Sequence, residues 1–137
     1  MTDSKLILVT GATGYVGGRL VPKLLEAGYR VRCLVRDPSR LEGRAWLHKV
    51  EVVKGDAVSK EGLAEVMHGV STAYYLIHGK QGGKLNAERD LQVARNFAHA
   101  AEEAGIDNII YFGELVDPTA NLSPYLRARH ETGYLLR

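Results

Sequence analysis

Apolar and polar positions along the chain alternate between two periods, one typical of buried strands and one typical of amphipathic helices. After a short polar stretch, the first apolar run is continuous over Leu6–Val9, which predicts a strand buried on both faces. Apolar residues then recur at helical spacing and predict a helix over Tyr15–Ala27, ended by Gly28. Pro22 falls inside that helix, where it removes a backbone hydrogen bond and is expected to kink it.

The same alternation continues along the chain. Further strands are predicted at Val31–Val35, Val50–Val53, Ala73–Ile77 and Asn108–Phe112. Helices are predicted between and after them: a weak one ending near Leu47, one from a cap at Ser59 to Gly69, one over Glu88–Ala104 with Gly105 at its end, and a last segment from about Ser123. Such βαβ units predict an α/β fold, a doubly wound parallel sheet of about five strands in the order 3-2-1-4-5 with helices on both faces.

The segment between the first strand and the first helix carries three glycines at a spacing suited to binding phosphate. It reads Thr10-Gly11-Ala12-Thr13-Gly14-Tyr15-Val16-Gly17. The first glycine allows a tight turn, the second lets a pyrophosphate approach the backbone, and the third lets the helix pack on the strand. The helix N-terminus adds unpaired N–H groups and the positive end of its dipole. The loop predicts a dinucleotide site, with glycines that only shape a turn and a cap as the alternative; its residues are Gly11, Thr13, Gly14, Tyr15, Val16 and Gly17.

This Gly-x-x-Gly-x-x-Gly loop resembles that of the extended and atypical short-chain dehydrogenase/reductases. Other matching stretches are Leu34–Pro38, Gly55-Asp56, Asn96–Ala101 and Ile109–Gly113. The resemblance covers essentially the whole chain and is strongest to NmrA-like NAD(P)-binding proteins and to bacterial proteins described as nucleoside-diphosphate-sugar epimerases or NAD(P)H-binding oxidoreductases. It implies a Rossmann fold, NADP or NAD as cofactor, and an oxidoreductase or epimerase-type activity on an unknown small-molecule substrate.

The end of the second predicted strand bears on the choice between NADP and NAD. An acidic residue about 20 positions beyond the loop holds the ribose 2′-hydroxyl of NAD, whereas an arginine favours the 2′-phosphate of NADP. Arg36 and Asp37 stand there together, and Arg40 follows as a second candidate cation. A guanidinium binds a phosphate in bidentate fashion, so NADP is favoured through Arg36. The alternative is a solvated strand end at which Arg36 pairs with Asp37.

Two further strand ends carry candidate cofactor contacts. In the resembling families the residue at the position of Asp56 contacts the adenine amino group, although a turn residue before the next helix explains Asp56 equally well. The resemblance places Ile77 and His78 beneath the nicotinamide ribose. His78 either contacts the cofactor or only ends the strand, and no catalytic role is assigned to it.

The catalytic residues of the resembling families are matched only in part. Those families use a tyrosine for proton transfer, a lysine four residues later on the same helix face, and a serine after the fifth strand. Here Tyr125 is followed by Arg129 at the lysine position, and Gly113-Glu114-Leu115 contains no serine. Tyr125 and Arg129 are therefore the candidate catalytic pair, with a surface helix turn as the alternative. A non-catalytic NADP-sensing or scaffold module, or an inactive fragment, is the alternative function.

Composition narrows the classes of function. Hydrophobic residues make up 45% and charged residues 25% of the 137 residues, as in an ordinary globular domain. Lys plus Arg is 18 against 16 for Asp plus Glu, which gives no electrostatic footprint for nucleic acid. The single cysteine, Cys33, excludes an internal disulfide, and the five histidines lack metal-ligand spacing, so no metal is expected. Without a long apolar run or a signal peptide, a cytoplasmic protein that binds no membrane is expected.

The resembling families continue beyond the tyrosine-bearing helix with at least one more strand and a substrate-binding portion, whereas this chain stops at Arg137. Residues 1–137 are therefore expected to form one NAD(P)-binding domain, truncated at its C-terminus relative to the family. A homo-oligomer in which another chain completes the sheet is a further expectation.

Overall fold

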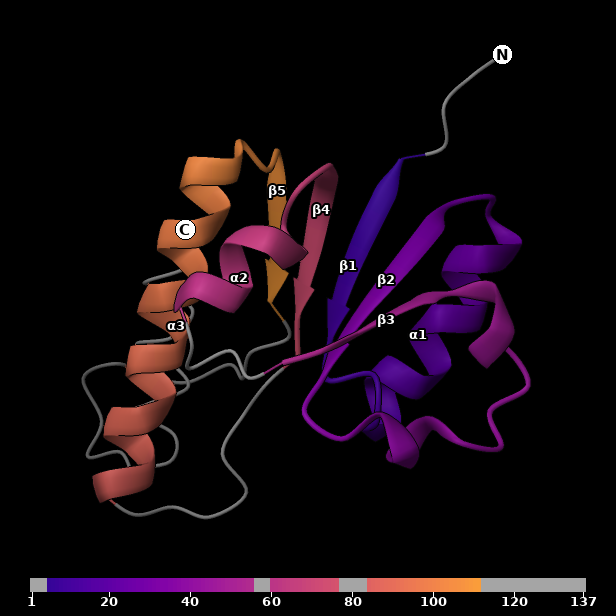
Figure 1. The fold of residues 1–137 in the computed structure, drawn as a ribbon, viewed down its shortest axis with the longest axis horizontal. Coiled ribbons are helices and arrows are strands. Elements are labelled where there is room, and N and C mark those ends of the chain that lie inside the picture. The colour runs from indigo at the N-terminus through magenta and orange to yellow at the C-terminus, as the bar shows by residue number, and fades with distance from the viewer. Residues whose placement is uncertain (1–4, 56–59, 77–83, 112–137) are drawn as a thin grey trace, which may run out of the picture.

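The computed structural model describes residues 5–55, 60–76 and 84–111. Within them, one sheet contains β1 (Leu6–Thr10), β2 (Arg30–Val35), β3 (Glu51–Lys54), β4 (Val70–Tyr75) and β5 (Asn108–Tyr111) (Figure 1). The strand order is β3-β2-β1-β4-β5, and all neighbouring strands are parallel. The predicted α/β fold and its strand order are confirmed.

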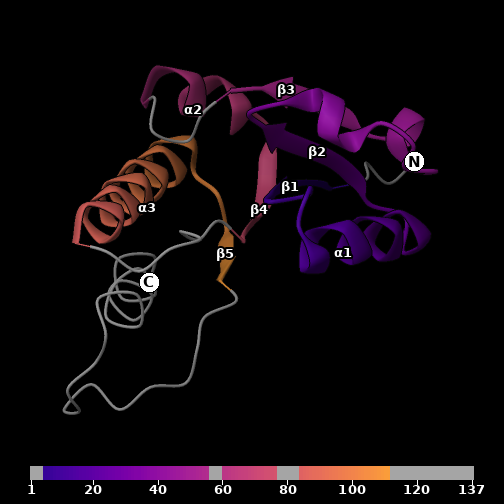
Figure 2. The same cartoon turned by 90° about the horizontal axis from the view of Figure 1, so that it is seen from below.

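Helices cover both faces of the sheet. They are α1 (Tyr15–Glu26), α2 (Lys60–Val66) and α3 (Lys84–Ala104). Figure 2 shows α1 on one side of the sheet and α3 on the other. Successive side chains of β1 enter two separate cores: Ile7 and Val9 belong to the core beneath α1, and Leu6 and Leu8 to the core beneath α2 and α3. Because β1 is buried along its whole length, its sequence is a continuous apolar run.

The connection from β2 to β3 differs from the sequence prediction. The predicted weak helix ending near Leu47 is wrong, because this segment contains two short 3₁₀ helices, η1 (Pro38–Leu41) and η2 (Leu47–Lys49). Gly43 lies between them with φ of +84°, a left-handed conformation that cannot continue a right-handed helix. Trp46 is buried in the core beneath α1 and fixes the segment to the sheet.

The other described elements lie close to their predicted positions. α1 is a single helix that continues through Pro22. β4 begins at Val70 rather than at Ala73, and α3 begins at Lys84 rather than at Glu88. Outside the described residues lie the predicted helix cap at Ser59, the predicted strand ends at Ile77 and Phe112, and the predicted last segment from Ser123.

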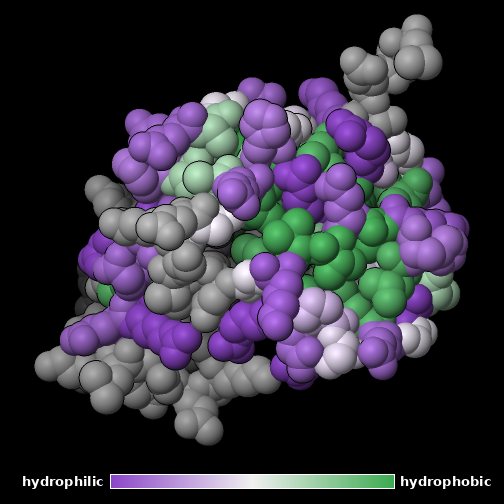
Figure 3. Space-filling view, viewed as in Figure 1, coloured by the Kyte–Doolittle hydropathy of each residue, from purple (hydrophilic) through white to green (hydrophobic). Residues whose placement is uncertain are grey.

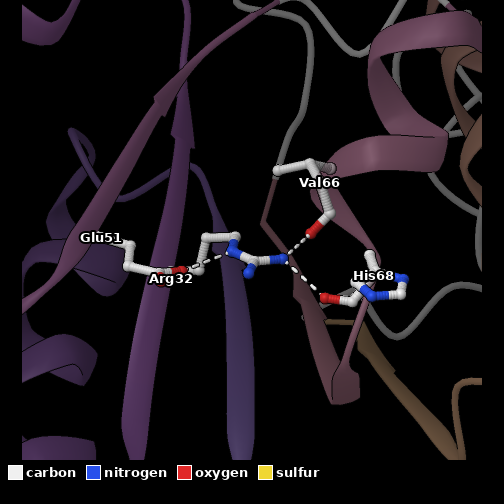
Figure 4. A network of polar contacts seen from close by, with 4 residues as sticks. All are labelled: Arg32, Glu51, Val66 and His68. Atoms are coloured by element: carbon white, nitrogen blue, oxygen red, sulfur yellow. Dashed lines mark hydrogen bonds and ion pairs between the residues drawn. The ribbon is translucent and has the colours of Figure 1, made fainter.

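Arg32 on β2 joins three elements on the α2 side of the sheet (Figure 4). Its Nε donates to the carboxylate of Glu51 on β3 at 2.7 Å, and its Nη1 donates to the carbonyl oxygens of Val66 and His68 at 2.6 and 2.9 Å. These carbonyls lie at the C-terminal end of α2, where unpaired C=O groups and the helix dipole favour a cation. Arg32 therefore has a structural role.

A cavity of about 370 Å³ lies beside this network, between β3 and α2. Its apolar lining consists of Leu34, Val53, Leu63 and Val66, its charged lining includes Arg32, Glu51 and Glu65, and the end of β3 at Lys54 and Gly55 borders it. In Figure 3, apolar side chains gather in the middle of the face on which β3 lies in Figure 1, and polar side chains surround them. No residue of the glycine loop lines the cavity, whereas Gly55, directly before the predicted cofactor residue Asp56, does.

Cys33, the single cysteine of the sequence, lies on β2 and is completely buried in the core beneath α1. Burial raises the pKa of its thiol to about 12. The thiol therefore stays protonated at neutral pH, and Cys33 contributes to packing rather than to a reactive site.

Two kinds of feature are absent from the part of the chain that the structure describes. It has no helix that is both long enough and apolar enough to cross a membrane. It also has no group of three or more His, Cys, Asp or Glu side chains that could hold a metal ion.

Candidate functional site

The predicted site residues that the structure describes lie at one edge of the sheet. Because neighbouring strands are parallel, the segments after β1, β2, β3 and β4 all leave the sheet at its carboxyl edge. The chain runs outward from β1 to β2 and β3 and then returns to β4 on the other side of β1, so the strand order reverses between β1 and β4. Open α/β sheets bind their ligands in the crevice at such a point.

Thr10 and Gly11 bring the ends of β1 and β4 close together at this point of the sheet. The completely buried Thr10 hydroxyl donates to the carbonyl of Tyr74 at 2.8 Å and accepts from the N–H of Leu76 at 3.3 Å, so it joins the ends of β1 and β4. Gly11 has φ of +84°, and a Cβ there would lie 2.9 Å from the carbonyl oxygen of Leu76. The turn and the end of β4 are therefore too close for a side chain at position 11.

Gly17 and Gly14 are glycines for different reasons. A Cβ at Gly17 would overlap the carbonyl oxygen of Gly11 and lie 2.8 Å from the Cα of Ala12, so the fold excludes a side chain there. Gly14 has φ of −84° and ψ of 178°, a conformation open to any residue, and a Cβ there would meet only the Gly11 oxygen, at 3.4 Å. The described structure gives no packing reason for glycine at position 14.

The first turn of α1 presents backbone donors that the described protein does not use. Gly14 is the N-cap and provides no side-chain cap, and the first turn contains no acidic residue. Within residues 5–55, 60–76 and 84–111, no acceptor engages the N–H of Tyr15, Val16 or Gly17. Unpaired N–H groups at the positive end of a helix dipole are an arrangement suited to an anion.

Two guanidinium groups that the sequence analysis missed lie against the same end of α1. Arg19 stacks on the exposed ring of Tyr15, with its guanidinium carbon 3.7 Å from the ring centroid. Arg44 approaches Gly18, its Nη1 lying 3.3 Å from the place that a Cβ there would occupy. A cation near a helix N-terminus is unfavourable unless an anion also binds. Gly18 was the available sequence signal, because a glycine inside a helix costs about 1 kcal/mol relative to alanine and so marks a position where a side chain is disfavoured for another reason.

The end of β2 separates the roles of Arg36 and Asp37. Asp37 caps η1, its Oδ1 accepting from the hydroxyl of Ser39 at 2.6 Å and from the Ser39 N–H at 3.1 Å. These hydrogen bonds, followed by the charges of Arg40 and Lys54, hold the pKa of Asp37 below its ordinary value. Arg36 is exposed and has no hydrogen bond or ion pair within the described residues, so the alternative Arg36–Asp37 pair is not formed there.

The remaining predicted site residues lie outside the described residues. They are the cofactor candidates Asp56, Ile77 and His78 and the catalytic candidates Tyr125 and Arg129. Their roles stay predictions. Gly55 and Leu76, which directly precede Asp56 and Ile77, follow β3 and β4 at the same edge as Arg36.

Sequence comparisons place this chain among known proteins. The sequence model of the NmrA-like family matches residues 3–124. A 3-beta-hydroxysteroid dehydrogenase of Mycolicibacterium neoaurum is 32% identical over 120 residues, which cover 80% of this chain and 32% of that protein. Photosystem II assembly factor Ycf39 of Cyanophora paradoxa is 29% identical over 134 residues, which cover 96% of this chain and 41% of that protein.

A solved structure shares the fold. The triphenylmethane reductase of Citrobacter sp., complexed with NADP(H), has a TM-score of 0.78 and 28% sequence identity, covering 98% of this chain and 45% of that chain. This chain thus spans 32% of the length of the steroid dehydrogenase and less than half of the reductase.

Proposed function

Because this chain belongs to the NmrA-like family, we propose that it is an NAD(P)(H)-binding domain and that its carboxyl-edge site takes NADP(H) in preference to NAD(H). The first turn of α1 carries the proposal, since the N–H groups of Tyr15, Val16 and Gly17 lack acceptors in the described chain. A diphosphate accepts hydrogen bonds from such donors. The glycine at position 14, for which the described fold gives no packing reason, would let the diphosphate approach the backbone.

Arg36 supports the preference for NADP(H). Its guanidinium is exposed and has no partner in the described chain, at the strand end where Rossmann folds hold the adenosine ribose. Asp37, the residue that would accept from the 2′-hydroxyl of NAD, is instead held toward η1 by Ser39. The similar triphenylmethane reductase was solved with NADP(H).

The activity that we propose for a complete protein containing this domain is hydride transfer or an epimerase-type reaction on a small molecule. The similar steroid dehydrogenase and triphenylmethane reductase support an oxidoreductase. Tyr125 and Arg129 remain the proposed catalytic pair, with Tyr125 transferring the proton.

A non-catalytic NADP-binding module is the second candidate. It is favoured by Arg129 at the position of the family's lysine, since a guanidinium cannot reproduce a compact ammonium at the ribose. The similar Ycf39 is named for assembly of photosystem II rather than for a reaction. A panel of carbonyl substrates followed by nicotinamide absorbance separates the two candidates. Turnover that Tyr125→Phe abolishes supports the enzyme, and tight NADPH binding without turnover supports the module.

Isothermal titration calorimetry with NADPH and NADH tests the proposed binding. We expect NADPH to bind about tenfold more tightly than NADH, because a guanidinium–phosphate contact is charge-assisted. Arg36→Gln should remove this difference, while Lys23→Gln, which removes a charge from the last turn of α1, should preserve it. Gly14→Ala should weaken both nucleotides by about tenfold or more, because the added methyl group blocks the approach of the diphosphate. Failure of the unaltered chain to bind either nucleotide would contradict the proposal.

A further inference from the structure

Asp37 is an acidic side chain at the strand end where the proposed ligand carries a phosphate. It directly follows Arg36. An uncompensated carboxylate at that place would repel a 2′-phosphate, whereas the 2′-hydroxyl of NAD(H) would be attracted to it. A site that selects NADP(H) therefore has to offset the charge of Asp37.

Hydrogen bonds hold the Asp37 side chain in one orientation. The hydroxyl and the N–H of Ser39 both donate to its Oδ1, at 2.6 and 3.1 Å. The N–H of Arg40 donates to the backbone carbonyl of Asp37 at 3.1 Å and closes the first turn of η1. These contacts direct the carboxylate toward η1, but they do not remove its charge.

Lys54 reaches this region from the neighbouring strand. It is the last residue of β3 and is paired with Val35, which lies two positions before Asp37 on the parallel strand β2. Val35 belongs to the core beneath α1, as does Leu41 of η1, so the paired Lys54 lies on the η1 side of the sheet. Lys54 is exposed and has no hydrogen bond or ion pair within the described part of the chain.

The charge of Lys54 acts on Asp37. Together with the charge of Arg40, and after the hydrogen bonds from Ser39, it holds the pKa of Asp37 below the ordinary value. Arg36, Arg40 and Lys54 contribute three positive charges and Asp37 one negative charge. The net charge of this cluster is therefore opposite in sign and about equal in size to that of a 2′-phosphate, which carries about −2 at neutral pH.

We propose that Lys54 is a specificity-determining residue, which together with Arg40 offsets the charge of Asp37 and so permits a 2′-phosphate to bind beside it. This inference rests on the proposed function and extends it to a residue on a different strand from Arg36. Lys54 acts through the electrostatic field and is not required to touch the phosphate.

Lys54→Glu tests the proposal, with Lys49→Glu as the matched control. Lys49 undergoes the same change of charge but ends η2, before the opposite end of β3, a strand that spans about 10 Å at roughly 3.3 Å per residue. The ligands, titrated by calorimetry, are NADPH, NADH, adenosine 2′,5′-bisphosphate and AMP. We expect Lys54→Glu to weaken NADPH and adenosine 2′,5′-bisphosphate by about tenfold and NADH and AMP by less than about twofold. The loss should shrink as NaCl rises from about 0.05 to about 0.5 M.

Three results separate the possible outcomes. A smaller loss of the same selectivity in Lys54→Gln, with the melting temperature unchanged, supports an effect of charge rather than of folding. Equal weakening of NADPH and NADH, or an equal effect of Lys49→Glu, overturns the role of Lys54 and leaves the proposed function standing. If the unaltered chain binds neither NADPH nor NADH, the proposed function and this inference both fail.

Discussion

Arg32, on β2, and Arg36, directly after β2, differ in whether the described protein uses their hydrogen-bond donors. Arg32 bonds to Glu51 and to the carbonyls of Val66 and His68, and its side chain is only 15% exposed. Arg36, which directly follows the strand, is exposed and bonds to nothing else in the described chain. The residue type alone therefore does not distinguish a structural cation from a binding cation. What distinguishes the two is whether acceptors within the described protein bind the N–H donors of the guanidinium group.

The glycine loop repeats this contrast. Gly17 is required because a side chain would overlap the turn at Gly11, whereas Gly14 has room for a methyl group in the described structure. In both pairs, the member without a structural explanation lies where the proposed dinucleotide would bind.

The largest effect is expected from Gly17→Ala. The added Cβ would meet backbone atoms, which cannot rotate away, so we expect a loss of about 3 kcal/mol or more in the free energy of unfolding. Gly14→Ala is the matched control and should change that free energy by less than about 0.5 kcal/mol. Chemical denaturation followed by circular dichroism measures both. Similar destabilisation of the two variants would mean that Gly14 is also held by the fold.

An intermediate effect is expected from Arg32→Met. The variant keeps most of the aliphatic stem but leaves Glu51 and two carbonyls without their donor, so we expect a loss of about 2 kcal/mol. Arg36→Met should change the free energy of unfolding by less than about 0.5 kcal/mol, because no described contact is lost. Urea denaturation compares the two variants. Equal losses in the free energy of unfolding would show that the two arginines do not differ in their structural role.

The smallest effect on stability is expected at Asp37, which caps η1 and also directly follows Arg36 at the proposed cofactor site. Because the pKa of Asp37 is lowered in the folded protein, its stabilising contribution is complete above the unfolded pKa, near 4, and is lost as the pH falls through the folded value. Thermal melts of the unaltered chain and of Asp37→Asn from pH 7 to pH 3 should therefore converge below about pH 4. Equal melting temperatures at pH 7, or a difference that persists at pH 3, would show that the ionised carboxylate does not stabilise the cap.

The sequence predicted the sheet well because a parallel strand buried on both faces appears in the sequence as a continuous run of apolar residues. Leu6–Val9 is continuously apolar since its alternate side chains enter different cores. The three helices likewise end before the predicted glycines Gly28, Gly69 and Gly105, each with positive φ. By contrast, the apolar and charged residues around Leu47 carry no clear period, and Gly43 interrupts any helix there.

The sequence predicted the glycine loop because its spacing is local. It did not predict the approach of Arg44 to Gly18, which depends on how the β2–β3 connection folds, or the effect of the Lys54 charge on Asp37, which depends on the register between β2 and β3. The hydrogen bond from Thr10 to Tyr74 spans 64 residues and follows only from the strand order. Contacts of this kind become visible once the register between strands is known.

The buried thiol of Cys33 can report on local opening of the folded chain. Because Cys33 is completely buried and its thiol stays protonated at neutral pH, a thiol reagent can reach the sulfur only when β2 separates locally from the core beneath α1. The rate of thiol labelling therefore measures how often this part of the sheet opens. A nucleotide that binds to and stabilises the loop between β1 and α1 would slow the labelling, so its binding could be detected without a label on the nucleotide.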